Sequence, residues 1–145
     1  MILYLDTSAL VKRFVLEKGS TDVNTLISTA DLVGSSIISQ VEMASALGKA
    51  LRMEWIDSTS AQSAYRDFLG QWQYFTRLTV SPGLIDRAAQ LSWDYGLRGY
   101  DATHMASALF WQDSLDMEIV LATYDRELWI AAKKSGIKNW PEYLD

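Results

Sequence analysis

The chain has 145 residues, the size of one ordinary domain, and 49% of them are hydrophobic. It has no cysteine and a single histidine, which excludes disulfides, zinc–thiolate centres, thiol catalysis and multi-histidine metal sites, so any metal would have oxygen ligands, as Mg²⁺ and Mn²⁺ prefer. The net charge of −5 disfavours nucleic-acid binding, because phosphate contacts normally use clustered Lys and Arg.

The first half of the chain alternates short apolar runs with amphipathic segments. Residues 2–5 form an apolar run that ends at a carboxylate, which predicts a buried strand. Apolar positions at helical spacing predict a helix over 7–16, and a shorter helix follows over 21–30. A second strand is expected within 34–39, and a helix from about residue 40 to 55 follows it.

The second half continues the alternation, with clear start and stop signals. Pro82 suits the first turn of a helix, and Gly96 and Gly136 are typical of helix ends. The expected elements are helices over 58–74, 82–95 and 101–111, a helix that ends near residue 135, and strands over 77–80, 117–123 and 137–138.

Strands therefore alternate with one or two helices throughout, which predicts an α/β fold with a parallel sheet and helices on both faces, in one domain over 1–145. No segment approaches the ~20 apolar residues that a membrane span requires. The apolar start is too short for a secretory signal and no basic segment precedes it. We expect a soluble, cytoplasmic protein without a membrane partner.

Four carboxylates occupy comparable places in this pattern. Asp6 and Asp125 follow strands, Glu42 lies in the first turn of a helix, and Asp101 begins another. Ligands of parallel sheets collect at the carboxyl ends of the strands, so these acids are expected to converge there. Carboxylates near a core are costly unless they are paired or bound to metal. Each acid alone is also explained as a helix cap or a solvated residue, and the pattern leaves both interpretations open.

Four blocks in order resemble the PIN-domain family, specifically the VapC-type toxins of bacterial and archaeal toxin–antitoxin pairs. The blocks span nearly the whole chain, and four of them together are far more specific than any one. They are Tyr4–Lys12, Ser36–Glu42 with Ala44 and Ala46, Leu97–Ala108, and Leu121–Leu128 with Ala131 and Ala132.

The resemblance implies a three-layer α/β/α sandwich and a Mg²⁺- or Mn²⁺-dependent endoribonuclease that leaves a 5′-phosphate and a 3′-hydroxyl. It also implies an RNA substrate, an antitoxin partner and a homodimer. Asp6 and Asp101 would be the principal metal ligands, and Glu42 would complete the site directly or through water. Asp125 would support a second metal or orient water. The hydroxyls that hydrogen-bond this cluster would be those of Thr7 and Thr123.

Some polar and aromatic residues allow two interpretations. Five basic residues flank the blocks and either bind phosphates or lie solvated on the surface: Lys12, Arg13, Lys49, Arg52 and Arg98. His104 shares a helix face with Asp101, and we interpret it as a satisfied, partly buried histidine that could also approach the site. The aromatic stripe, defined as Tyr65, Phe68, Trp72 and Phe75, fits a dimer or antitoxin interface as well as plain core.

Two other functions compete with the ribonuclease. One is a PIN-like binding module that has lost its metal, although all four acids are present. The other is an acidic-pocket magnesium phosphotransfer domain, which would carry a second acid close to the first. Here Asp6 is followed by Thr7 and Ser8, which disfavours it.

Overall fold

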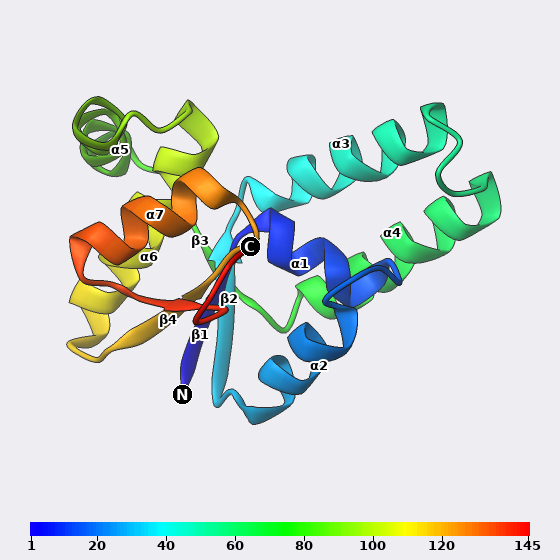
Figure 1. Ribbon diagram of the computed structural model, residues 1–145, viewed down its shortest axis with the longest axis horizontal. Coiled ribbons are helices and arrows are strands. Elements are labelled where there is room, and N and C mark those ends of the chain that lie inside the picture. Colours follow the sequence, from blue (N-terminus) through cyan, green and yellow to red (C-terminus); the bar gives the residue numbers. More distant parts are fainter.

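Five parallel strands and seven helices alternate along the chain (Figure 1). The computed structural model describes residues 1–145. Its elements are β1 (Ile2–Leu5), α1 (Thr7–Phe14), α2 (Ser20–Thr29), β2 (Leu32–Ser36), α3 (Ser39–Arg52), α4 (Ser58–Trp72), β3 (Thr76–Leu78), α5 (Pro82–Tyr95), α6 (Gly99–Leu115), β4 (Ile119–Ala122), α7 (Arg126–Ser135) and β5 (Lys138–Trp140).

The sheet has the order β3-β2-β1-β4-β5, and all four pairings are parallel. The chain leaves β1 toward β2 and β3 on one side and later returns to β4 on the other. The strand order therefore reverses between β1 and β4, where Leu5 lies in register with Ala122. Crevices beyond the carboxyl ends of strands at such a reversal are the usual ligand sites of parallel sheets.

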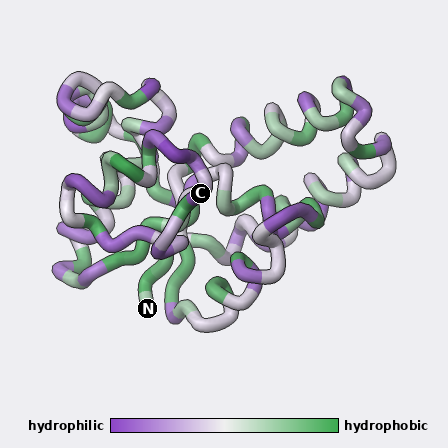
Figure 2. The backbone as a smooth tube through the Cα atoms, viewed as in Figure 1, coloured by the Kyte–Doolittle hydropathy of each residue, from purple (hydrophilic) through white to green (hydrophobic).

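Each face of the sheet has its own apolar core, which confirms the predicted three-layer arrangement. In β1, Ile2 and Tyr4 face α5, α6 and α7, whereas Leu3 and Leu5 face α1, α3 and α4. The central strands β1 and β4 are correspondingly apolar over their whole length (Figure 2). Burial on both faces explains why β1 and β4 are unbroken apolar runs rather than alternating ones. None of the helices combines the length and apolar character that a bilayer-spanning helix requires.

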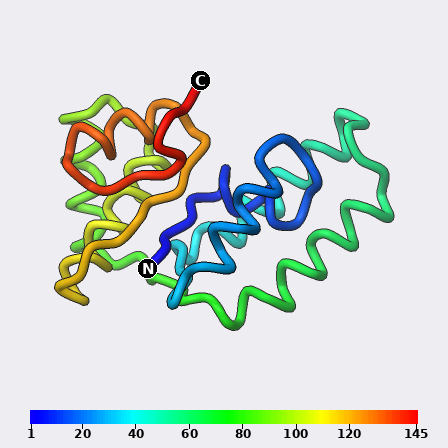
Figure 3. Tube along the Cα trace, turned by 60° about the horizontal axis from the view of Figure 1, so that its bottom comes forward, coloured from blue at the N-terminus to red at the C-terminus, as the bar shows by residue number.

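The pair α3 and α4 extends from the body of the molecule as an arm (Figures 1 and 3). At its base the aromatic stripe packs inward, with Phe68 and Trp72 buried and Tyr65 and Phe75 partly buried. Phe68 contacts Phe14 of α1 edge to face, at a centroid distance of 5.5 Å. Of the two interpretations, the structure therefore favours core packing over an exposed interface.

Several helix boundaries differ by a few residues from the predicted ones, and two of the differences have a visible cause. The helix expected to reach residue 55 ends at Arg52, because Glu54 adopts a left-handed conformation with φ 59°, and Trp55 is left 65% exposed. The helix expected over 101–111 runs to Leu115 and ends where Asp116 takes φ 49°. In both places a polar residue in the left-handed region closes the helix without glycine, which sequence patterns do not reveal.

Gly34 of β2 lets α6 approach the sheet closely. A Cβ atom there would lie 2.7 Å from the Trp111 ring and 2.9 Å from the Thr76 carbonyl oxygen. We expect Gly34→Ala to lower the free energy of unfolding by about 1–3 kcal/mol, because ring and backbone must both shift. Denaturant unfolding would measure this, with Gly70→Ala as the control, since a Cβ at Gly70 meets nothing within 4 Å. Equal stability of the two variants would contradict the close packing of α6 against Gly34.

Candidate active site at the carboxyl edge of the sheet

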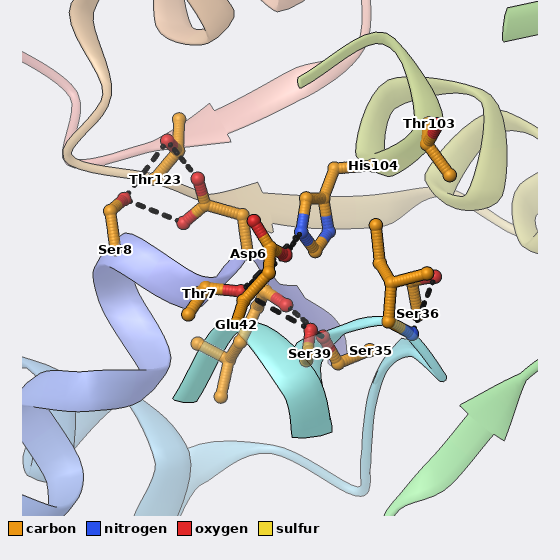
Figure 4. A network of polar contacts seen from close by, with 12 residues as sticks. Asp6, Thr7, Ser8, Ser35, Ser36, Ser39, Glu42, Thr103, His104 and Thr123 are labelled. Atoms are coloured by element: carbon orange, nitrogen blue, oxygen red, sulfur yellow. Dashed lines mark hydrogen bonds and ion pairs between the residues drawn. The ribbon is translucent and has the colours of Figure 1, made fainter. Parts of the chain in front are cut away.

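Asp6 is the most deeply buried of the four candidate acids, with 3% of its surface exposed. It follows β1 and caps α1, where its Oδ1 accepts the Ala9 N–H (3.1 Å) and the Ser8 hydroxyl (2.7 Å). Its Oδ2 accepts the hydroxyl of Thr123, at the end of β4, at 2.8 Å (Figure 4). Burial raises the pKa of Asp6, and the nearby His104 ring together with these hydrogen bonds only partly offsets that effect. All of its bonded partners are neutral, so its charge has no direct counterion.

Glu42 lies in the first turn of α3 and is held through one of its two oxygens. Its Oε1 accepts the Thr7 hydroxyl at 2.7 Å and lies 2.5 Å from Nε2 of His104. Burial raises the pKa of Glu42, but the contacts with His104 and Thr7 outweigh burial and leave the pKa lowered. Its Oε2 makes no hydrogen bond to the protein and is available to a ligand.

His104 is buried, and both of its ring nitrogens have partners. Nδ1 lies 2.7 Å from the hydroxyl oxygen of Tyr4, which accepts the Ser36 N–H at 3.1 Å. In the neutral tautomer that satisfies these contacts, the phenol donates to Nδ1 and Nε2–H donates to Glu42. Burial raises the pKa of Tyr4 well above its ordinary value, so the phenol keeps its proton. The contacts from the Ser36 N–H through Tyr4 and His104 therefore connect β2, β1 and α6 to the Glu42 carboxylate on α3.

Asp101 and Asp125 form a second group, joined by Arg98. Arg98 Nε donates to Asp101 Oδ2 at 3.1 Å, and Nη2 donates to Asp125 Oδ2 at 2.9 Å. Asp125 also caps α7 by accepting the Leu128 N–H at 2.9 Å, and its own N–H donates to Thr123 Oγ1 at 3.0 Å. Burial and the charge of Asp125 raise the pKa of Asp101. Asp101 Oδ1, like Glu42 Oε2, makes no hydrogen bond to the protein.

A cavity of about 520 Å³ opens beside these groups, a volume suited to a nucleotide-sized ligand. Its walls include two of the candidate acids and one arginine. The lining residues are Glu42, Arg98, Gly99, Tyr100, Asp101 and Thr103. Of the five basic residues named from the sequence, only Arg98 lines this cavity. Lys12 instead pairs with Glu17 at 3.0 Å.

The sequence missed the roles of Tyr4, Ser8 and Ser36. In the sequence, Tyr4 resembles the apolar residues of its buried strand. Its phenol is the only polar side-chain group in that strand, and a buried hydroxyl that needs a partner was the available signal. Ser8 joins Asp6 to the segment after β4 by donating to Asp6 Oδ1 and accepting the Tyr124 N–H at 2.8 Å. Hydroxyl residues are common at helix starts, so no sequence signal distinguished it.

The donor set suits a hard divalent cation. It consists of carboxylates, and Asp6 carries a buried charge that a cation would compensate. No three of the acidic and histidine side chains approach closely enough to form a preassembled ligand set. Mg²⁺ is commonly held by one or two carboxylates, with water and substrate phosphate completing its shell, so the residues present fit such an ion.

Comparison with known proteins identifies the relatives of the chain. Ribonuclease VapC49 of Mycobacterium tuberculosis (strain ATCC 25618 / H37Rv) is 31% identical over 144 residues, which cover 99% of this chain and 98% of the relative. The crystal structure of PAE2754 from Pyrobaculum aerophilum superposes with a TM-score of 0.63 at 24% identity, covering 96% of this chain and 92% of that one. A toxin–antitoxin complex from Klebsiella pneumoniae gives a TM-score of 0.55 at 16% identity, covering 81% and 83%.

The solved structures confirm the expected fold, a three-layer sandwich around a short parallel sheet. The family model described as the PIN domain matches residues 3–134, which include all four candidate acids. Because this match spans most of the sequence and the VapC relative aligns over nearly its whole length, the chain belongs to the PIN-domain family.

Proposed function

We propose that this protein is a divalent-metal-dependent endoribonuclease and the toxin of a toxin–antitoxin pair. The observation that carries the proposal is the placement of Asp6, buried and without a counterion, where the strand order reverses. The other three acids lie on the segments around it, and two of them, Glu42 and Asp101, line a nucleotide-sized cavity. The relative named Ribonuclease VapC49, which aligns over 98% of its length, supports this reaction class.

The hydrogen bonds of each carboxylate suggest a role for each acid. Asp6 and Asp101 would hold the cation, and Asp101 Oδ1 is free to do so. Glu42 Oε2 is free to coordinate the same ion or to orient a water, while Thr7 and His104 fix its other oxygen. A bound Mg²⁺ or Mn²⁺ would polarise the phosphodiester and lower the pKa of a bound water. Both oxygens of Asp6 and of Asp125 have hydrogen-bond partners. Asp6 is assigned to the ion because its charge is buried without a counterion, whereas Asp125, paired with Arg98, would orient water or support a second metal.

The partners follow from the same proposal. RNA would be the substrate, and the toxin–antitoxin complex among the similar structures supports a cognate antitoxin as protein partner. Homodimerisation remains a prediction from the family resemblance. Bound cations would reduce the net charge of −5, which removes part of the electrostatic objection to an RNA substrate.

Metal-dependent cleavage tests the function directly. Purified protein is incubated with 5′-labelled total RNA in Mg²⁺, Mn²⁺ or EDTA, and Mn²⁺ binding is followed by calorimetry. We expect discrete labelled fragments with new 3′-hydroxyl ends in the metal lanes and intact RNA in EDTA. Intact RNA in every lane together with no metal binding would overturn the proposal and leave a non-catalytic binding module.

Thr123→Val tests the support of Asp6. Thr123 donates to Asp6 Oδ2 and accepts the Asp125 N–H, and valine can do neither. Loss of such a supporting hydrogen bond typically weakens metal affinity or activity about 10–100-fold, and we expect this range for both. Thr25→Val is the control, because the Thr25 hydroxyl bonds only the carbonyl of Thr21 on an exposed helix face. Wild-type metal affinity in Thr123→Val would exclude a supporting role.

A further inference from the structure

Arg98 is the only Lys or Arg side chain that forms an ion pair with any of the four candidate acids. It reaches Asp101 with Nε and Asp125 with Nη2, so one guanidinium lies between carboxylates from α6 and from the start of α7. The guanidinium offsets the repulsion between these two carboxylates. Arg98 therefore supplies a positive charge to two of the four candidate acids, Asp101 and Asp125.

This cation is held by charge rather than by packing. The Arg98 side chain is 77% exposed and makes no hydrogen bond other than those to the two carboxylates. A long, exposed side chain can change rotamer without opening a cavity in the core. An ion bound by Asp101 would lie close to the guanidinium, and the two positive charges would repel. The Arg98 bridge therefore weakens metal binding, and metal binding weakens the Arg98 bridge by the same free energy.

Arg98 also lines the cavity in which an RNA phosphate would lie, together with Glu42, Gly99 and Tyr100. A guanidinium binds phosphate as readily as carboxylate, with the same paired N–H donors. We propose, on the basis of the function proposed above, that Arg98 has two states. In the metal-free protein it bridges Asp101 and Asp125, and in the metal-loaded protein it is released to bind a phosphate of the RNA.

If Arg98 exchanges between the two carboxylates and the RNA, its removal should strengthen metal binding and weaken RNA binding. Arg98→Ala is expected to tighten Mn²⁺ binding about tenfold by calorimetry, since the competing cation is gone. It is also expected to raise the KM for RNA about tenfold. The slope of log KM against log salt should fall by about 0.7–1, the signature of one lost phosphate contact. If Arg98 only held the two aspartates in position, Mn²⁺ binding would weaken together with RNA binding.

Two further variants separate this role from general charge effects. Arg87→Ala removes an equally charged, exposed side chain that pairs only with Asp113, at 2.8 Å, and it should leave both affinities near wild type. Arg98→Lys keeps the charge but cannot span both carboxylates with one planar group, so both effects should be intermediate.

The possible results distinguish this inference from the proposed function. Unchanged or weaker Mn²⁺ binding in Arg98→Ala, with normal binding in wild type, would overturn the two-state arginine and leave the ribonuclease intact. A tenfold gain in both Arg98→Ala and Arg87→Ala would also overturn it, because net charge alone would then suffice. Absence of Mn²⁺ binding and of cleavage in wild type would overturn the proposed function itself.

Discussion

Asp6→Asn is expected to abolish metal-dependent RNA cleavage and at the same time to raise the melting temperature of the metal-free protein. Losing a residue that supports a metal ligand costs about 10–100-fold, so losing a principal ligand should cost more than about 100-fold in kcat/KM. The amide preserves the shape of the Asp6 side chain, and its oxygen can still cap α1 at Ala9. Loss of activity would therefore reflect the missing charge rather than a broken fold.

The stability gain follows from the direction of the Asp6 pKa. Burial raises that pKa in the folded state, so the folded protein binds more protons than the unfolded chain at pH values between the ordinary and the raised pKa. In that interval the free energy of unfolding falls as pH rises, and above it the ionised Asp6 keeps the folded protein less stable. The asparagine of the variant carries no charge and avoids this cost. In EDTA the advantage of the variant should be largest at neutral pH and should shrink as pH falls.

Thermal unfolding in EDTA and in saturating Mn²⁺ measures this exchange. A change of 1 kcal/mol shifts the melting temperature of a domain of this size by about 2–4 °C. Mn²⁺ should stabilise wild type through binding to the folded state and should have little effect on Asp6→Asn. Asp57→Asn is the matched control: Asp57 also caps a helix but is exposed with a lowered pKa, so its neutralisation should not stabilise. A metal-free Asp6→Asn protein less stable than wild type would contradict the electrostatic account.

Phe68→Ala is expected to have the largest effect on stability. Phe68 is fully buried, and its ring lies 5.5 Å from that of Phe14 and 5.1 Å from that of Trp72. Truncation of a buried phenylalanine costs about 3–5 kcal/mol, through lost burial and the cavity that remains. The melting temperature should fall on the order of 10 °C, given about 2–4 °C per kcal/mol. This contact holds the α3 and α4 arm against α1, so arm residues should lose hydrogen-exchange protection first.

The neighbouring residue supplies the control for this experiment. Leu69 lies on the same helix but is 41% exposed, so Leu69→Ala should cost much less than Phe68→Ala. Equal losses of unfolding free energy in the two variants would show that the aromatic stripe does not stabilise the core at the base of the arm. Metal binding in Phe68→Ala, measured below its melting temperature, should stay near wild type, because the stripe touches none of the four acids.

The order of the elements, the α/β class and the four candidate acids could all be predicted from the sequence alone. These features are local. An apolar run followed by an acid, as at Leu5 and Asp6, predicts a strand end whatever the rest of the chain does. Helix starts at Asp57 and Pro82 were visible because capping and proline geometry depend on a few adjacent residues. The ordered motif blocks added the family, which the structure and the comparisons confirmed.

The contacts between these residues could not be predicted from the sequence, because they depend on how distant elements pack. Thr123 reaches Asp6 across 117 positions of sequence, and His104 reaches Tyr4 across 100, because the β1–β4 pairing and the packing of α6 bring them together. The bridge from Arg98 to Asp125 depends in the same way on how α6 and α7 pack. Hydrophobic periodicity specifies which face of an element is buried. It carries no information about which distant element covers that face, and the side chains of this site come from segments far apart in the chain.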